Sequence, residues 1–471
     1  MNQMPDYLLL RILGGIPIEE RIPLERVSRQ WDRIVRLSLL KTRKLETESY
    51  DLLELLLELG VQLEELNVSC LDHRFASIVA FLDELALRCD TSSLRKLVVS
   101  DFRLDDVDSA GFQLADASIP PFRALEELSL IQPRNSISLE STNWTAHFSV
   151  PFPSLQCLRL HLPFYGGFDQ PAWRIPDGLS QLRQLYLSSQ TQEIQLRSLS
   201  PRQPFQFNHF IYTASSLRAC ELLEVLVLDG EPILRLACIE HLSRYASSLR
   251  RLWTSASLEH NAFLGLMAEA PEGLATLGQL TALTHLHLGV WPLVKYEDPE
   301  CPVSETVARA LAVGCSRLES LQLPGSCLSD GSLMALGGLV ELRELDVSGS
   351  PSLHDFSLID ALKHLRRLRR LFVCKCTGLK GLFLPTALSQ CPELSFIGIF
   401  GCNRIQIDTL LSAAPIIALR TKPISLSGRA GFALAEIFTE PELQGLPLHL
   451  DMVEDEEHEH HAPPAFPNRF P

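Results

Sequence analysis

The residues with the greatest capacity for chemistry in this chain are its histidines and cysteines. His285 and His287 are two residues apart in an alternating stretch, so both rings would lie on one face of a strand. Two imidazoles placed this way can share a metal ion, but no Cys, Asp or Glu partner is evident nearby in the sequence. Cys374 and Cys376 have the same spacing, which is poor for zinc. We therefore predict neither a metal site nor a cofactor.

Motifs typical of catalysis are absent from the sequence. No GxSxG, HExxH, P-loop or GxGxxG occurs in a strand–helix context. The chain has 12 cysteines, and because no export signal precedes them we expect thiols rather than disulfides. Several lie just before or just after an apolar motif, where a thiol would fill a small buried slot. We predict that the protein is not an enzyme.

A short apolar motif, LxxLxL, recurs along the chain, with Val, Ile or once Thr in its last position. Its copies begin at Leu63, Leu94, Leu125, Leu155, Leu182, Leu223, Leu249, Leu283, Leu318, Leu342, Leu368 and Leu394. Within each copy the apolar residues alternate as in a strand, and helical spacing lies between copies. One strand and one helix cannot bury their own apolar faces, so neighbouring units must stack. The pattern predicts an α/β leucine-rich-repeat solenoid with parallel strands on the concave face and helices outside.

The same alternation predicts which side chains line the concave face. They are the third and fifth residues of each motif and the residue after it. This set includes Tyr186, Arg251, Trp253, His285, His287, Gln322, Glu344, Asp346, Arg370, Phe372, Phe396 and Phe400. Large aromatic residues at exposed strand positions are typical of protein contacts. Either this face binds a partner protein, or its bulky side chains fill the groove against one another or against the loops.

Composition excludes some classes of partner. The formal net charge of −15 over 471 residues argues against a nucleic-acid surface, which needs clustered Lys and Arg. No stretch of eighteen uncharged apolar residues occurs, so we predict no membrane span. No apolar segment follows a basic start, so we predict no signal peptide and a cytoplasmic or nuclear location.

Residues 1–46 carry no LxxLxL motif and have helical spacing instead. Pro5-Asp6 is a helix-start signal, and Gly14-Gly15 ends the first apolar stripe. A second helix must place Pro23 in its first turn or kink there, and a third begins near Ser28. Three short helices make a very small core. The segment is therefore either a cap for the repeats or a module that completes its core on another protein.

These residues resemble an F-box. The pattern of that family is followed by Met4-Pro5-Asp6-Tyr7-Leu8-Leu9, Ile12-Leu13, Ile16-Pro17, Glu19-Glu20-Arg21 and Val27-Ser28-Arg29-Gln30-Trp31. The chain departs from the pattern at Met4, Tyr7, Ser28 and Pro23. An F-box followed by leucine-rich repeats is a known pairing, and the order here is the order of that family.

The resemblance implies the substrate receptor of a Skp–cullin–F-box (SCF) ubiquitin ligase. Its F-box would dock on a Skp-type adaptor and through it on a cullin, and its repeats would hold an unknown substrate protein. By position, the adaptor contact would fall on Pro5, Leu8, Leu9, Ile12, Leu13, Ile16, Pro17, Val27 and Trp31. Some of these must form the core of the module itself, and the sequence does not divide them. The alternative is a leucine-rich-repeat scaffold or inhibitor without a ligase role.

We expect four segments along the chain. They are a helical module (1–46), the repeats (47–415), a C-terminal cap (416–450) and an acidic, His- and Pro-rich disordered tail (451–471). A helix at 47–62 would lead into the first clear strand, and a degenerate strand would occupy 42–46. Insertions at 190–216 and 290–303 are either decoration or ligand contacts.

Overall fold

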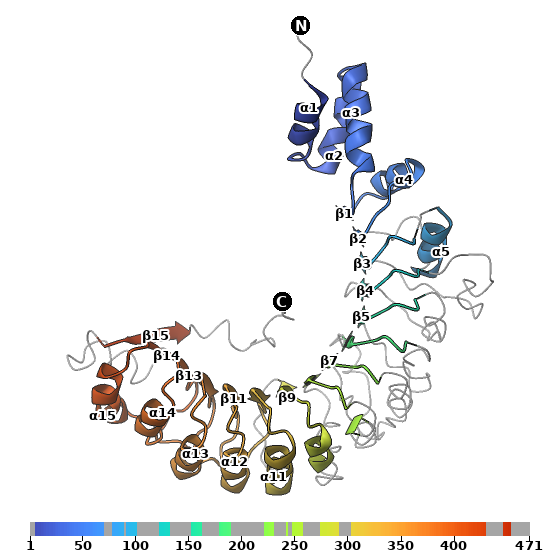
Figure 1. Ribbon diagram of the computed structural model, residues 1–471. Helices are drawn as coiled ribbons and strands as arrows, with labels where there is room; N and C mark the ends of the chain where they lie inside the picture. The colour runs from blue at the N-terminus through green and yellow to red at the C-terminus, as the bar shows by residue number, and fades with distance from the viewer. Residues whose placement is uncertain are drawn as a thin grey trace, which may run out of the picture. The chain divides into compact units, whose positions relative to one another are not determined.

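The fold is seen in a computed structural model (Figure 1). It describes residues 5–69, 78–88, 91–100, 122–131, 152–162, 179–189, 221–229, 242–243, 247–257, 274–291, 303–429 and 446–453. The chain consists of two compact units, Met1–Leu223 and Glu224–Pro471. Most of the predicted insertions, at 190–216 and 292–302, and residues 454–471 of the predicted tail lie outside the described residues.

Short helices form the start of the first unit, as predicted. They are α1 (Asp6–Leu13), α2 (Ile18–Arg21), the 3-10 helix η1 (Ile22–Arg26) and α3 (Arg29–Leu40). Pro23 lies in the first turn of η1, where its missing N–H costs no hydrogen bond, so the second helix is short but not broken. Ser28 caps α3, because its hydroxyl accepts a hydrogen bond from the Trp31 amide (3.3 Å). The small core contains Leu9, Leu13, Ile34, Val35 and Leu39.

Parallel strands follow in the first unit. They are β1 (Lys44–Thr47), β2 (Glu65–Val68), β3 (Lys96–Ser100), β4 (Glu127–Ile131), β5 (Cys157–Leu162) and β6 (Gln184–Ser189). In the sequence, helix α4 (Tyr50–Glu58) lies between β1 and β2, and helix α5 (Ile78–Arg88) lies between β2 and β3. The pairing register aligns Leu45, Leu66, Leu97, Leu128, Leu158 and Leu185, which are buried. The degenerate strand predicted near 42–46 is therefore present as β1.

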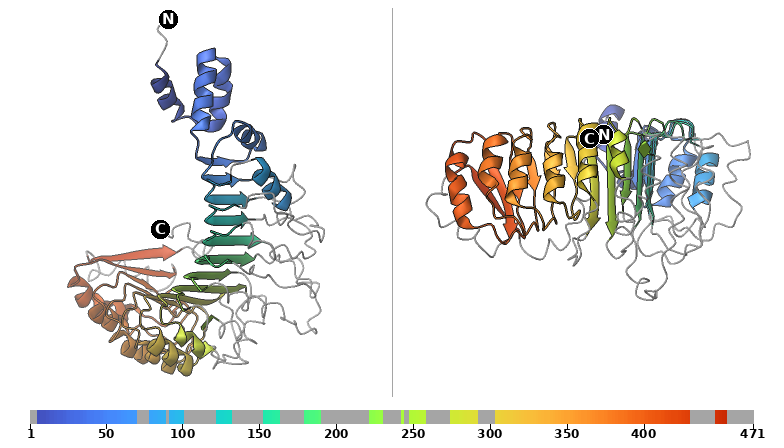
Figure 2. Two further views of the ribbon diagram at one scale, coloured as in Figure 1. Left: turned by 45° about the vertical axis from the view of Figure 1, so that its right-hand side comes forward. Right: turned by 90° about the horizontal axis from the view of Figure 1, so that it is seen from below.

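The second unit has the same construction. Its strands are β7 (Val225–Asp229), β8 (Arg251–Ser257), β9 (His285–Trp291), β10 (Ser320–Gln322), β11 (Glu344–Asp346), β12 (Arg370–Phe372), β13 (Phe396–Gly398), β14 (Ile424–Arg429) and β15 (Leu448–Val453). Its helices are η7 (Ala275–Gln279), α11 (Glu305–Gly314), α12 (Asp330–Leu336), α13 (Asp355–Leu362), α14 (Leu384–Gln390) and α15 (Ile407–Ala418). Figure 2 shows the helices of this unit on one side of its strands. Both units confirm the α/β leucine-rich-repeat fold.

Buried polar contacts tie each repeat to the one before it. The Cys315 thiol donates to the Leu277 carbonyl oxygen (3.4 Å), and the Cys402 thiol donates to that of Val373 (2.9 Å). Burial raises the pKa of Cys315 to about 11 and that of Cys402 to about 12, so both stay protonated donors. Asp355 accepts from the next repeat, from the amides of Lys380 (2.8 Å) and Phe383 (3.2 Å). The described cysteines are free thiols, as predicted.

The C-terminal boundaries differ from those expected. The boundary placed after residue 415 falls inside α15, which contains Pro415, and the boundary placed after 450 falls inside β15. Strands β14 and β15 pair in parallel, with Leu426 opposite Leu450, and continue the sheet of the second unit. Neither strand opens with the LxxL signal, so only their period-two alternation of Ile and Leu marked them. The first boundary, at 46, likewise falls inside β1.

Candidate functional site

The helical module divides the predicted adaptor residues into two groups. Leu9 and Leu13 are buried and belong to its core. Ile12 is 46% exposed and Val27 is 62% exposed, although both are apolar. Pro5 and Pro17 are exposed, and Leu8, Ile16 and Trp31 are half-buried. The module thus closes a core of its own and still presents apolar side chains to solvent.

Polar contacts hold the helices that carry these side chains. Asp6 at the start of α1 accepts from Gln30 Nε2 (3.0 Å) and pairs with Arg33, both on α3. Arg21 Nε donates to the Ile16 carbonyl oxygen (2.8 Å), which fixes the turn between α1 and α2. Tyr7, which follows Asp6, was not among the predicted adaptor residues, and it is 68% exposed. Its position is where the sequence departs from the F-box pattern.

The second candidate surface is the face of the strands that points away from the buried leucines, here called the open face. In the first unit it carries ion pairs between neighbouring strands: Lys44 with Glu65, and both Lys96 (3.1 Å) and Arg159 (2.8 Å) with Glu127. The Arg159 guanidinium also lies 4.9 Å from the centre of the Tyr186 ring. Tyr186 is buried and donates to Gln184 Oε1 (3.2 Å). This part of the open face is polar, and its charges are largely satisfied internally.

In the second unit, the open face carries two stacked rings on β8 and β9. Trp253 on β8 and His287 on β9 lie 3.7 Å apart with an interplanar angle of 6°. The register places them directly opposite each other. Gly289 makes room for the imidazole, because a Cβ there would come within 2.4 Å of His287 Nε2. With any larger residue at position 289, the imidazole would have to move from its present place in the stack.

Hydrogen bonds extend from His287 across the next strands. His287 Nδ1 lies 2.9 Å from Gln322 Oε1, and Gln322 Nε2 donates to Glu344 Oε1 (2.8 Å). Because the amide oxygen of Gln322 can only accept, His287 Nδ1 must carry the proton. Burial lowers the pKa of His287 to about 4, so the ring is neutral at pH 7. This histidine is a structural hydrogen-bond donor of the open face.

The contacts then reach a cluster of aromatic rings around Arg370. Glu344 Oε2 lies 3.6 Å from Arg370 Nη1, and the guanidinium lies 5.0 Å from the Phe372 ring centre and 5.7 Å from that of Phe396. The two phenyl rings are 5.0 Å apart. Gly398 gives them space, since a Cβ there would lie 3.0 Å from Phe372 Cδ1. All three side chains of the cluster remain partly accessible.

The remaining predicted residues of the open face are engaged as well. His285 is half-buried, with Nδ1 2.9 Å from Thr284 Oγ1, and burial followed by the charge of Arg251 lowers its pKa. Asp346 accepts from the Ser348 amide (2.9 Å), and burial raises its pKa to about 6. Phe400 is half-buried after β13. The bulky side chains therefore pack against one another, and several keep an accessible edge.

Within the described ranges, no three His, Cys, Asp or Glu side chains gather as a metal site requires. Among the helices that the structure describes, none is both long and apolar enough to cross a membrane.

Comparisons with known proteins give fold-level likeness only. No family model matches the chain, and no curated protein matches it. Solved structures that resemble it include an internalin (InlF) from Listeria monocytogenes, with 14% identity and a TM-score of 0.43 over 82% of this chain and 92% of that one. A chain of the yeast Rad7–Elc1 complex has 16% identity and a TM-score of 0.37 over 69% of this chain and 74% of that one. The leucine-rich-repeat protein LegL7 from Legionella pneumophila has 13% identity and a TM-score of 0.36 over 63% and 90%.

Proposed function

We propose that the chain is the substrate-binding subunit of an SCF-type ubiquitin ligase. The helical module would dock on a Skp-type adaptor and through it on a cullin, and the open strand face would hold the substrate protein. The observation that carries the proposal is the exposure of Ile12 and Val27 on a module whose core is already closed by Leu9 and Leu13. Exposed apolar side chains on the module that also carries half-buried Trp31 suit the centre of a protein interface.

The chain itself would contribute proximity rather than catalysis. A receptor that holds its client near a reactive thioester raises the effective concentration of the client lysines without changing the chemistry of transfer. This role needs a docking module and a client surface on one chain. The transfer chemistry would be supplied by other subunits, in the cytoplasm or nucleus.

Docking is tested by co-expression of the full chain with a Skp-type adaptor. Ile12→Asp places a charge on the proposed interface while leaving the core leucines in place, and we expect it to weaken binding at least 30-fold, the effect of about 2 kcal/mol. Val313→Asp is the matched control, because Val313 is an exposed apolar residue (81%) on α11 of the second unit. If wild type, Ile12→Asp and Val313→Asp bind the adaptor with equal affinity, the helical module is not part of the interface.

The client surface is tested separately on the open face. Trp253→Ala with Phe396→Ala removes one ring from each aromatic group of the second unit. We expect adaptor binding to be unchanged and client proteins, identified by mass spectrometry from cell extracts, to be depleted relative to wild type. Clients retained at wild-type levels would move the substrate site off this face. A chain that binds no adaptor would instead favour the scaffold alternative.

A further inference from the structure

Two rows of side chains run along one flank of the second unit, where the chain passes from each helix into the next strand. The first row is the residue just before the first leucine of each motif: Ser248, Ala282, Arg317, Glu341, Arg367 and Glu393. The second row is the residue just after that leucine: Glu224, Arg250, Thr284, Glu319, Arg343, Arg369 and Ser395. Equivalent positions of successive repeats are neighbours in space, as the strand register shows.

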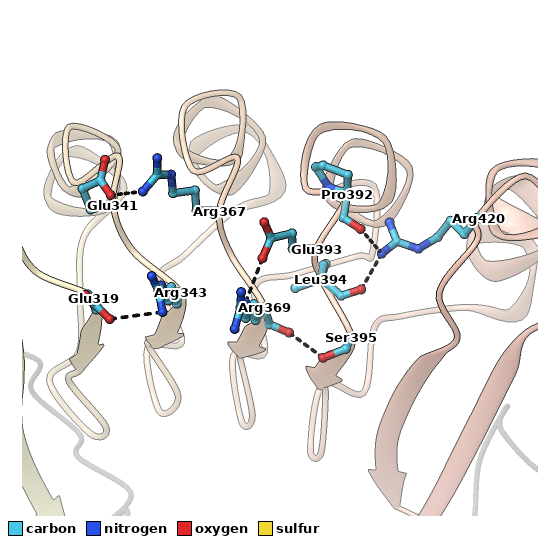
Figure 3. A network of polar contacts seen from close by, with 10 residues as sticks. All are labelled: Glu319, Glu341, Arg343, Arg367, Arg369, Pro392, Glu393, Leu394, Ser395 and Arg420. Atoms are coloured by element: carbon cyan, nitrogen blue, oxygen red, sulfur yellow. Dashed lines mark hydrogen bonds and ion pairs between the residues drawn. The ribbon is translucent and has the colours of Figure 1, made fainter.

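From Glu319 onward, ion pairs join the charged side chains of these rows from one repeat to the next. Arg343 Nη1 lies 3.4 Å from Glu319 Oε2, Arg369 Nε donates to Glu393 Oε2 (2.8 Å), and Arg367 pairs with Glu341. Figure 3 shows these pairs bridging one repeat to the next. Each of these arginines therefore has a carboxylate on the adjacent repeat.

Earlier along the same flank, three of the side chains in the two rows are short, and a cavity lies there. Ser248, Ala282 and Thr284 line a cavity of about 310 Å³ together with Glu224, Arg250 and Arg317. We call this cavity the flank pocket. It lies entirely within the second unit. Its floor is held by hydrogen bonds between repeats, since the Arg250 carbonyl oxygen accepts from the Thr284 amide (2.8 Å) and from Thr284 Oγ1 (3.0 Å).

The two arginines of the flank pocket are the ones that lack an acidic partner. Among the residues that the structure describes, neither Arg250 nor Arg317 forms an ion pair, whereas Arg343, Arg367 and Arg369 all do. The cause is visible in the sequence. Ala282 stands where Arg369 finds Glu393 on the next repeat and where Arg367 finds Glu341 on the preceding one. Glu224 precedes Arg250 in its row and lines the pocket, but no ion pair joins the two described side chains. The pocket thus brings together two arginines that form no ion pair in the described part of the chain and one carboxylate, that of Glu224.

We propose that the flank pocket binds an oxyanion, a phosphate or a carboxylate, between Arg250 and Arg317. A guanidinium presents a planar fork of donors that matches both groups, and two such forks supply charge-assisted hydrogen bonds from two directions. The volume lies at the lower end of the range for ligand pockets, which suits a single small charged group rather than a large ligand. A free anion and an anion carried on a peptide present the same group to the two arginines, so the chemistry of recognition is the same.

Calorimetric titration of the full chain at constant ionic strength tests this site, with inorganic phosphate in one arm and a hexaglutamate peptide in the other. We expect saturable binding of at least one probe. In the double variant Arg250→Gln with Arg317→Gln we expect that affinity to fall at least tenfold. The matched control is Arg343→Gln with Arg369→Gln, which removes the same charge from the same flank where carboxylates are already in place. It should bind within about twofold of wild type.

Each outcome decides the matter. Binding of phosphate alone assigns a phosphoryl ligand, and binding of hexaglutamate alone assigns a carboxylate ligand. No saturable binding of either probe to wild type, or equal losses in both double variants, would overturn the proposal, because the latter would be a general effect of charge. Circular dichroism checks folding, and Arg250→Lys with Arg317→Lys keeps the charge while removing the forks. That variant should bind with an affinity between those of wild type and the Gln double variant.

Discussion

The buried histidine of the open face yields a prediction whose size follows from the structure. Burial lowers the pKa of His287 from 6.5 to about 4, and the proton on Nδ1 is committed to Gln322 Oε1. Histidine-selective ¹³C NMR of the full chain would follow this ring as pH falls. The chain has 14 histidines, so the resonance must be assigned by its loss in His287→Gln. We expect a midpoint near pH 4.

The same shift has a consequence for stability. Because the folded pKa lies below the unfolded value, the unfolded chain takes up the proton first, and the contribution of His287 to stability falls as pH drops from 6.5 toward 4. At about 1.4 kcal/mol per pH unit, the loss at pH 4 is about 3 kcal/mol. Urea unfolding of wild type and His287→Gln at pH 7 and pH 4 measures it as a change in the difference between the two proteins.

The pKa of Asp346 is shifted upward, whereas that of His287 is shifted downward, so Asp346 changes the stability of the fold with pH in the opposite direction. When stabilities at pH 7 and pH 4 are compared, the effect of His287 must be separated from that of Asp346. Burial raises its pKa from 3.8 to about 6, so its ionised form destabilises the fold as pH rises through that range. Both proteins carry Asp346, and its contribution cancels in their difference. A midpoint near 6.5 for His287, with the same stability difference at both pH values, would refute the account of a dry, stacked imidazole.

Three further substitutions test the packing of the second unit. Arg420→Met removes donors to four carbonyl oxygens at the end of α14, among them that of Leu388 (2.7 Å), so hydrogen exchange there should speed about 30-fold, the effect of about 2 kcal/mol. Arg420→Lys should recover only part of this protection. Asp355→Ala leaves two backbone donors without their acceptor and should cost about 2–3 kcal/mol in urea unfolding. Gly398→Ala crowds Phe372 and should lower thermal stability by about 1 kcal/mol. If any of these variants keeps the exchange rate or stability of wild type, the contact that it alters does not stabilise the fold as we infer.

The repeat fold could be predicted because its signal is redundant. The fourth residue of each motif, from Leu66 to Ile397, is a buried strand residue, and one period fixes the position of the next strand. The motif did not predict strands β14 and β15, because both lack its first leucine. Pattern alone also placed the boundaries inside α15 and β15, since a helix and a strand continue through Pro415 and Leu450 without a change of composition.

The details of the candidate site were less accessible from sequence. Alternation correctly placed Trp253 and His287 on one face, but the stack between them depends on Gly289, whose role is visible only when the imidazole is seen over it. The division between Leu13, in the core of the module, and Ile12, on its surface, depends on how α1 is rotated against α3. Helical spacing gives both residues the same apolar stripe. The flank pocket arises from side chains missing in one repeat, which a motif of leucines does not report.

The central claim is that the N-terminal module docks on a Skp-type adaptor. Titration calorimetry of the full-length chain against the purified adaptor measures this directly. The account predicts a one-to-one complex with a dissociation constant in the micromolar range or tighter. A flat titration with folded wild-type protein would contradict it, and would leave a leucine-rich-repeat protein whose helical module has another purpose.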